Sequence, residues 1–291
     1  MRINSLLISV IAVQVVSVAW AHGPGHMVRE AGHSALEEAV GVEETGIPGG
    51  SGGADRGWGV EATTGWESRH VHYGVNETGN SGAYATELGV EIGGLVLNAW
   101  NGFGLGNEFL EWDFSAGYNI ELGPVFLMPG YNFRYMPGHV EEGDHGEEHA
   151  DLAHEGGGEG HGGHGHNTYG NELFLAVGTT AIPYVTPGAN FVWDLSNLPG
   201  AFLEFRLDGD VPVYKETLSL QPYALLGLNL GYNTTDVYGL NNFQFGAQAT
   251  CRICEHLSAF TGVNYSVALE ALEAVGQENV AWVNVGLSFD Y

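Results

Sequence analysis

The chain has 291 residues, and its 35 aspartates and glutamates against eight lysines and arginines give a formal net charge of -27. Such a chain repels phosphate groups, which excludes nucleic acids as partners. Lys215 is the one lysine, while 46 residues are glycine and 11% are aromatic. Soluble β proteins use lysine to protect their sheet edges, so this composition indicates a different environment for the outer face of any sheet.

An export signal is predicted at residues 1–21. Arg2 precedes a nearly continuous apolar run from Leu6 to Val18, and Ala19-Trp20-Ala21 fits the small-x-small rule for cleavage. The run is about 13 residues long, shorter than the roughly 20 that a spanning helix needs, which argues against the alternative of an uncleaved anchor. We expect an exported mature chain that begins at His22.

Residues 22–55 are polar and rich in glycine and histidine, and we interpret them as a disordered leader. His22 and His26 are one weak candidate pair of metal ligands at the new amino terminus. From residue 56 to residue 291 the sequence predicts a single β domain.

Apolar and polar residues alternate with a period of two from Gly57 onward, which is typical of β-strands with two different faces. In the last strand one face is apolar and the other is polar or small. The apolar face holds Ala281, Val283, Val285, Leu287, Phe289 and Tyr291, and the opposite face holds Asn284, Gly286, Ser288 and Asp290.

The pattern predicts about twelve strands that cross a membrane, because they reach the roughly 9–11 residues of a tilted transmembrane strand. A soluble sandwich also alternates, but the polar face here is small and neutral to acidic, as a wet lumen requires. Short and long connections tend to alternate, so short periplasmic turns and long extracellular loops are expected. The fold class is therefore all-β, a closed antiparallel transmembrane barrel. The expected strands are approximately 57–73, 82–92, 95–103, 107–121, 125–137, 168–180, 188–196, 200–213, 216–232, 241–252, 257–269 and 279–291.

Two stretches carry a resemblance to known outer-membrane proteins. The last strand ends in an aromatic residue, Tyr291, and resembles the terminal signal that barrel-assembly machinery reads. The stretch from Gly65-Trp66-Glu67-Ser68-Arg69 to Tyr73-Gly74, followed by Ala99-Trp100-Asn101 and Phe114-Ser115-Ala116-Gly117-Tyr118, is similar to the TorF-like porin family. The similarity is diffuse over residues 57–137. It implies a channel in the outer membrane of a Gram-negative bacterium, with no settled substrate.

Charged residues are expected on the inward face of the barrel. Ten of them are acidic and three are arginines, and an acidic lining in a narrow lumen favours cations. The alternative is that they are solvated charges without selectivity. The candidates are Glu61, Glu67, Arg69, Glu87, Glu91, Glu111, Asp113, Arg134, Glu172, Asp194, Glu204, Arg206 and Asp208.

A histidine-rich segment at residues 138–167 is predicted to be an extracellular loop. Imidazoles mixed with carboxylates suit Zn²⁺, Ni²⁺ or Cu²⁺, but the irregular spacing and the glycines predict loose binding at several sites. A solvated low-complexity loop without metal is the alternative. The candidate ligands are His139, His145, His149, His154, His161, His164 and His166.

Cys251 and Cys254 are the two cysteines of the chain. Redox motifs with this spacing open a helix beside a parallel sheet, whereas this pair lies at a predicted hairpin end. Because an exported protein enters an oxidising compartment, we expect the two cysteines either to form a local disulfide or to be thiols without a function.

Together these features predict a non-enzymatic, porin-like channel for passive diffusion of small solutes, mildly cation-preferring, with a narrow pore. No cofactor is required, and outer-membrane lipid is the surrounding partner. The first alternative is a barrel that anchors a metal-binding surface loop. The lower alternative is an outer-membrane lipid hydrolase, although the chain contains no His-Glu-x-x-His motif.

Overall fold

The computed structural model describes residues 57–137, 168–196, 200–215, 217–232 and 237–291. The predicted signal peptide, the leader and the histidine-rich segment lie outside the described residues.

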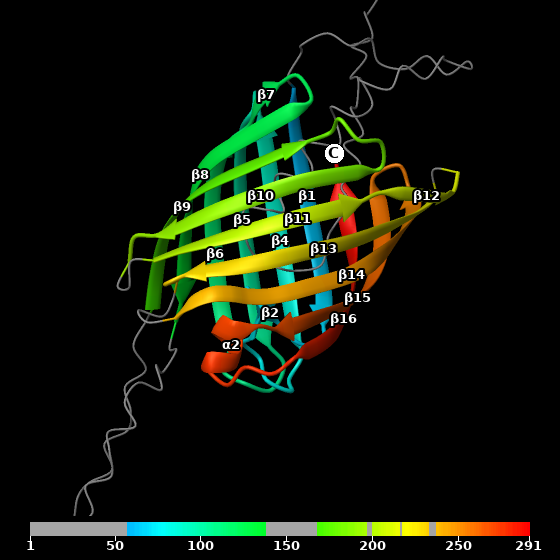
Figure 1. Ribbon diagram of the computed structural model, residues 1–291. Coiled ribbons are helices and arrows are strands. Elements are labelled where there is room, and N and C mark those ends of the chain that lie inside the picture. Colours follow the sequence, from blue (N-terminus) through cyan, green and yellow to red (C-terminus); the bar gives the residue numbers. More distant parts are fainter. Residues whose placement is uncertain (1–56, 138–167, 197–199, 216, 233–236) are drawn as a thin grey trace, which may run out of the picture.

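Twelve strands of the described chain close into one antiparallel barrel (Figure 1). Neighbours along the sequence pair with each other, β11 pairs with β13, and β1 pairs with β16, so the ring has no open edge. The predicted fold class is therefore confirmed. The strands are β1 (Trp58–Glu67), β4 (Ala83–Ile92), β5 (Leu95–Gly104), β6 (Leu110–Tyr118), β8 (Val125–Met136), β9 (Thr168–Thr179), β10 (Val185–Asp194), β11 (Gly200–Gly209), β13 (Leu218–Leu230), β14 (Tyr238–Cys254), β15 (Leu257–Ala268) and β16 (Val280–Asp290).

Five short elements accompany the ring. β7 (Ile120–Leu122) pairs with β8, and β12 (Val211–Tyr214) pairs with β13, so each extends a hairpin of the barrel. β2 (Val71–His72) and β3 (Val75–Asn76) pair only with each other. A single turn of helix, α2 (Glu270–Ala274), precedes β16. Within the described residues, no helix has the length and apolar character needed to span a membrane.

Apolar side chains lie on the outside of the barrel. Along β16, Val283, Val285 and Leu287 are exposed, whereas Asn284 and Ser288 between them are buried. Val263 on the neighbouring strand is 60% exposed. Each large aliphatic side chain that is kept out of water gains about 1.5–3 kcal/mol, so an outer face of this kind is suited to hydrocarbon. The closed ring satisfies the backbone hydrogen bonds that such a medium cannot.

The two ends of the barrel differ. Short turns join β4 to β5 and β14 to β15, and Trp58 and Asp290 lie at the same end, which we call the short-turn end. The opposite long-loop end carries α2 and the β2–β3 hairpin, at the bottom of Figure 1. Residues 105–109, between β5 and β6 at the long-loop end, are as few as residues 180–184 at the opposite end, so the connection lengths alternate only in part.

The first strand differs from its prediction. It was expected to continue to residue 73, but β1 ends at Glu67 and residues 68–82 fold back into the barrel. Tyr73 and Gly74 have positive φ values of 46° and 82°, the pattern of a type I′ turn, and they reverse the chain between β2 and β3. Arg69 consequently is not on a strand, and its guanidinium bonds Asn80 at 3.3 Å and the carbonyl of Ala281 at 3.4 Å.

Two walls of the barrel interior carry uncharged side chains of different kinds. An apolar wall, on β8 to β11, is formed by Phe126, Met128, Phe174, Ala176, Val192 and Phe202. A polar wall, on β13 to β16, is formed by Gln221, Gln244, Gln248, Thr250, Asn264 and Asn284. Met128, Gln221 and Asn284 are each at most 1% exposed, so these side chains are packed against their neighbours.

Candidate functional site

The β2–β3 hairpin crosses the lumen at the long-loop end. Its tip residue Tyr73 packs on Phe202 with ring centroids 4.3 Å apart, and on Tyr232 with centroids 5.1 Å apart. Nδ2 of Asn241 donates to the carbonyl of Tyr73 over 2.7 Å. The hairpin therefore starts beside β1 and ends against β11 and β14.

Close packing holds the hairpin in this position. A Cβ atom on Gly74 would lie 2.7 Å from Cδ1 of Leu272 and 2.9 Å from Cβ of Asn242, so the tip touches α2 and the polar side of β14. Val71 is fully buried in a cluster with Val280 and Trp282. The hairpin thus fills the long-loop end as a plug.

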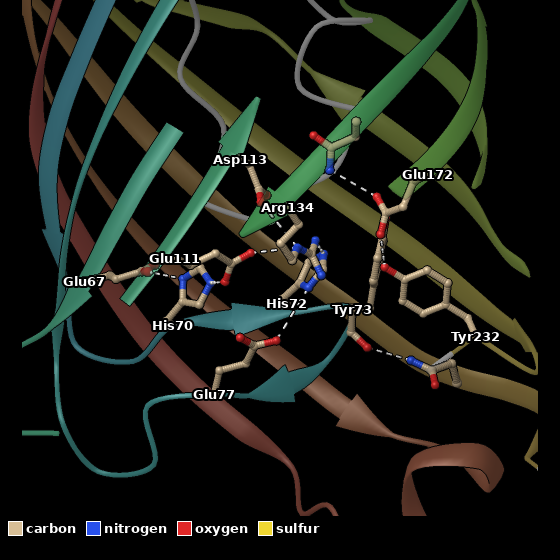
Figure 2. Close-up of polar contacts among 12 residues, drawn as sticks. Glu67, His70, His72, Tyr73, Glu77, Glu111, Asp113, Arg134, Glu172 and Tyr232 are labelled. Carbon is tan, nitrogen blue, oxygen red and sulfur yellow. Dashed lines mark hydrogen bonds and ion pairs between the residues drawn. The ribbon is translucent and has the colours of Figure 1, made fainter. Parts of the chain in front are cut away.

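His70 is held between two carboxylates of the barrel wall (Figure 2). Its Nδ1 lies 2.7 Å from Oε1 of Glu67, and its Nε2 lies 4.0 Å from Oε2 of Glu111. Burial by itself lowers the pKa of His70, but the adjacent Glu67 carboxylate outweighs that effect and raises this pKa to about 9. The ring also stacks on Trp100, with centroids 5.3 Å apart.

Arg134 joins the wall to the second histidine of the hairpin. Its Nε lies 2.8 Å from Oε1 of Glu111 and 3.4 Å from Oδ1 of Asp113. Its Nη2 lies 3.0 Å from Nε2 of His72. Burial and the charge of Arg134 lower the pKa of His72, so a neutral imidazole accepts from the guanidinium.

Two carboxylates complete this central network. Oε1 of Glu77, on the hairpin connection, lies 3.6 Å from Nδ1 of His72. Burial raises the pKa of Glu77, but hydrogen bonding to His72 and the charges of His70 and Arg134 lower it to about 2. On β9, Glu172 accepts from the hydroxyl of Tyr232 and, at 3.1 Å, from Nδ2 of Asn132.

A second charged group lies closer to the short-turn end, on β11. Nε of Arg206 donates to Asp208 at 2.8 Å, and its Nη1 lies 3.8 Å from Glu204. The guanidinium also lies over the ring of Tyr223, 5.3 Å from its centroid. These residues form a compact ion group on the wall.

The other predicted lumen residues are spread apart. Glu61 accepts from Thr63 at 3.1 Å, and Glu87 accepts from Asn98 at 2.5 Å. Asp194 accepts from the backbone of Ser196, and Glu91 is exposed near the short-turn end. Of the thirteen residues predicted from the sequence, the structure thus brings five together in the central network, which are Glu67, Glu111, Asp113, Arg134 and Glu172.

Sequence reasoning missed the hairpin half of this network. His70, His72 and Glu77 were not among the predicted residues because the segment was assigned to a strand and a surface loop. The signal for a hairpin lies in Val71-His72-Tyr73-Gly74-Val75-Asn76. Two short segments that can form strands, Val71-His72 and Val75-Asn76, flank the turn pair Tyr73-Gly74.

The structure does not test the two other predicted sites. The seven histidines proposed as metal ligands lie outside the described residues. Cys251 and Cys254 are both exposed free thiols at the end of β14. Their disulfide stays a prediction.

Comparison with known proteins gives no family. No family model matches the chain, and no curated protein matches it, so the TorF-like resemblance stays a prediction. Among solved structures, the KdgM porin is 7% identical, with a TM-score of 0.49, over 79% of this chain and 98% of that one. The NanC porin is 11% identical, with a TM-score of 0.48, over 79% and 98%. An outer membrane channel from Pseudomonas putida F1 is 12% identical, with a TM-score of 0.42, over 83% and 100%. These likenesses are too distant to assign a substrate or an activity to this chain.

Proposed function

We propose that this chain is an outer-membrane, porin-like channel for small solutes, which pass along the polar wall when the channel is open. The β2–β3 hairpin is the plug that closes it. The observation that supports this most is the inward hydrogen-bonded series on β13 to β16. A barrel that serves only as an anchor has no need of buried amides throughout its length, because apolar side chains would fill it equally well.

The series runs between the two ends of the barrel. Near the short-turn end, Nε2 of Gln248 lies 3.4 Å from Thr250. Asn284 lies 3.4 Å from Gln248 and 3.1 Å from Asn264. Tyr223 then links Asn264 to Gln244 with bonds of 2.8 and 2.9 Å. Several of these bonds are at the long limit for hydrogen bonding, so water or a polar solute replaces them at small cost.

The plug covers the long-loop end of this route. Asn242 continues the series toward Ser266 at 3.3 Å, and the hairpin tip rests on Asn241 and Asn242. Withdrawal of the hairpin would uncover both amides. The acidic surplus of the central network supports a mild preference for cations.

Planar-bilayer recording tests the proposal. We expect low conductance for the mature chain and a rise of at least about tenfold after deletion of residues 70–79, since a plug then leaves the lumen. Deletion of these residues removes His70, His72 and Glu77 and retains Ser68, Arg69 and Asn80 as the connection.

Two further variants in the deletion background locate the route. Gln248→Leu with Asn284→Leu should lower the conductance, whereas the outward control Val283→Leu should leave it unchanged. Reversal potentials in a salt gradient measure the cation preference. A deletion variant that folds and conducts no ions would overturn the channel proposal.

Metal binding by residues 138–167 stays a second, separate proposal. Removal of that segment and calorimetry with zinc test it, and unchanged zinc uptake would contradict it.

A further inference from the structure

Three ligand-type side chains converge where the hairpin meets the barrel wall. His70 and Glu77 belong to the connection between β1 and β4, and Glu111 belongs to β6. One ligand atom from each lies within 4.8 Å of the other two. Two segments distant in sequence therefore bring a nitrogen and two carboxylates to one point (Figure 2).

Buried carboxylate oxygens at this point have no hydrogen bond. Oε2 of Glu111 and Oε2 of Glu67 are both in this condition, although each side chain is only 1% exposed. Leaving a buried acceptor unsatisfied is costly, and more so when it carries charge. Oε2 of Glu111 points to the side of His70 on which a ligand would bind, 4.0 Å from Nε2.

Acidic groups also gather around this point. Five carboxyl groups surround one guanidinium and two imidazoles. A bound divalent ion displaces protons from such groups and favours their ionised form. The carboxylates are Glu67, Glu77, Glu111, Asp113 and Glu172.

The orientation of His70 matches that of a metal-bound histidine. Ligating histidines usually donate their second ring N–H to a carboxylate, which fixes the tautomer and directs the other nitrogen at the metal. Nδ1 of His70 lies 2.7 Å from Oε1 of Glu67, and Nε2 is on the side of Glu111. Glu67 therefore has the place of the orienting carboxylate.

We propose that His70, Glu77 and Glu111 form a site for a divalent transition-metal ion, with Zn²⁺ the best suited, and that the ion fastens the hairpin to the barrel wall. Imidazole nitrogen disfavours Ca²⁺ and Mg²⁺, which select oxygen ligands. Three protein ligands leave a fourth position for water. Zinc bonds of about 2.0–2.2 Å require the three side chains to draw together slightly, and the partly exposed Glu77 has the freedom to do so. This site does not depend on the channel proposal.

Thermal unfolding of the full mature chain in detergent, stripped with a chelator and titrated with ZnCl₂, tests the site. We expect zinc to raise the Tm of the wild type by about 5 °C or more. Glu77→Gln and Glu111→Gln keep the side-chain shape but remove the ligand charge, and both should abolish the rise. Glu121→Gln, an exposed glutamate of β7, is the matched control and should retain it.

The histidine-rich residues 138–167 are a second place where zinc could bind. X-ray absorption of the wild type loaded with one zinc per chain separates the two, because this site gives one imidazole and mainly oxygen ligands. A spectrum with imidazole ligands only would overturn the proposal. An equal zinc-induced rise of Tm in all three glutamine variants, or no rise in the wild type, would also overturn it. If Glu111→Gln does not fold, Glu77→Gln still tests the site, because Glu77 lies on the hairpin connection and not on a barrel strand.

Discussion

Nη2 of Arg134 lies 3.0 Å from Nε2 of His72, so a guanidinium on β8 holds a histidine of the inserted hairpin. The same arginine pairs with Glu111 on β6 through Nε at 2.8 Å. Arginine is always charged and offers several donors in one plane, which allows one side chain to tie the plug to two strands of the wall. The position of the hairpin therefore depends on this residue.

Arg134→Met tests that dependence. The substitution keeps the length of the side chain but leaves Glu111 and Asp113 without their cation, and loss of one partner of a buried pair costs about 3–5 kcal/mol. We expect this loss in urea unfolding of the refolded barrel in detergent. The control is Arg69→Met at the rim, which should change stability by less than about 1 kcal/mol. Equal effects of the two substitutions would contradict the role of Arg134.

Gly74→Ala and Gly79→Ala form a matched pair within the same connection. Both glycines have positive φ, at 82° and 61°, so alanine costs about 1 kcal/mol of backbone strain at either position. A Cβ at Gly79 meets no atom within 4 Å, whereas at Gly74 it meets Leu272 and Asn242. We expect Gly74→Ala to cost about 1–3 kcal/mol more and to increase hydrogen exchange of the hairpin.

Equal exchange in the two alanine variants would indicate that the tip of the hairpin does not rest on α2 and β14. Wild-type protein measured under the same conditions gives the baseline.

Val263→Lys tests the orientation of the barrel wall. Val263 is in the middle of β15 and 60% exposed, on the face assigned to lipid. A lysine at the middle of the bilayer costs about 2–4 kcal/mol, so the urea midpoint in vesicles should fall. Val275→Lys, at a residue that follows α2 and is 53% exposed, should have little effect. A tolerated Val263→Lys would place that face in water and remove the membrane assignment.

Tyr232→Phe removes the hydroxyl that donates to Glu172. The carboxylate then retains the bond from Asn132, and we expect a loss of about 1–3 kcal/mol in unfolding free energy. The exposed Tyr184→Phe is the control and should be neutral. If Tyr232→Phe left the unfolding free energy unchanged, water would replace the Tyr232 hydroxyl as a donor to Glu172.

The sequence determined the barrel because strand periodicity is a local property. Each residue on a strand faces one of two directions, so alternation assigned Glu111, Asp113, Arg134 and Glu172 to the inward face without knowledge of their neighbours. The order of the strands followed as well, since neighbouring strands joined by short connections pair with each other. The largest error in a strand end is in the first strand, which was expected to end at residue 73 rather than at Glu67.

The tertiary structure alone decided what fills the lumen. A type I′ turn at Tyr73 and Gly74 is compatible with a surface loop or with a plug, and the choice depends on side chains far away in the sequence. Phe202, Asn241 and Leu272 receive the hairpin tip, and Arg134 receives His72. Such contacts form only when the ring closes, because closure brings β6, β8, β11 and β14 to face one interior. Alternation predicts the face of the sheet on which a side chain lies, but only the closed barrel determines which residues that side chain contacts across the interior.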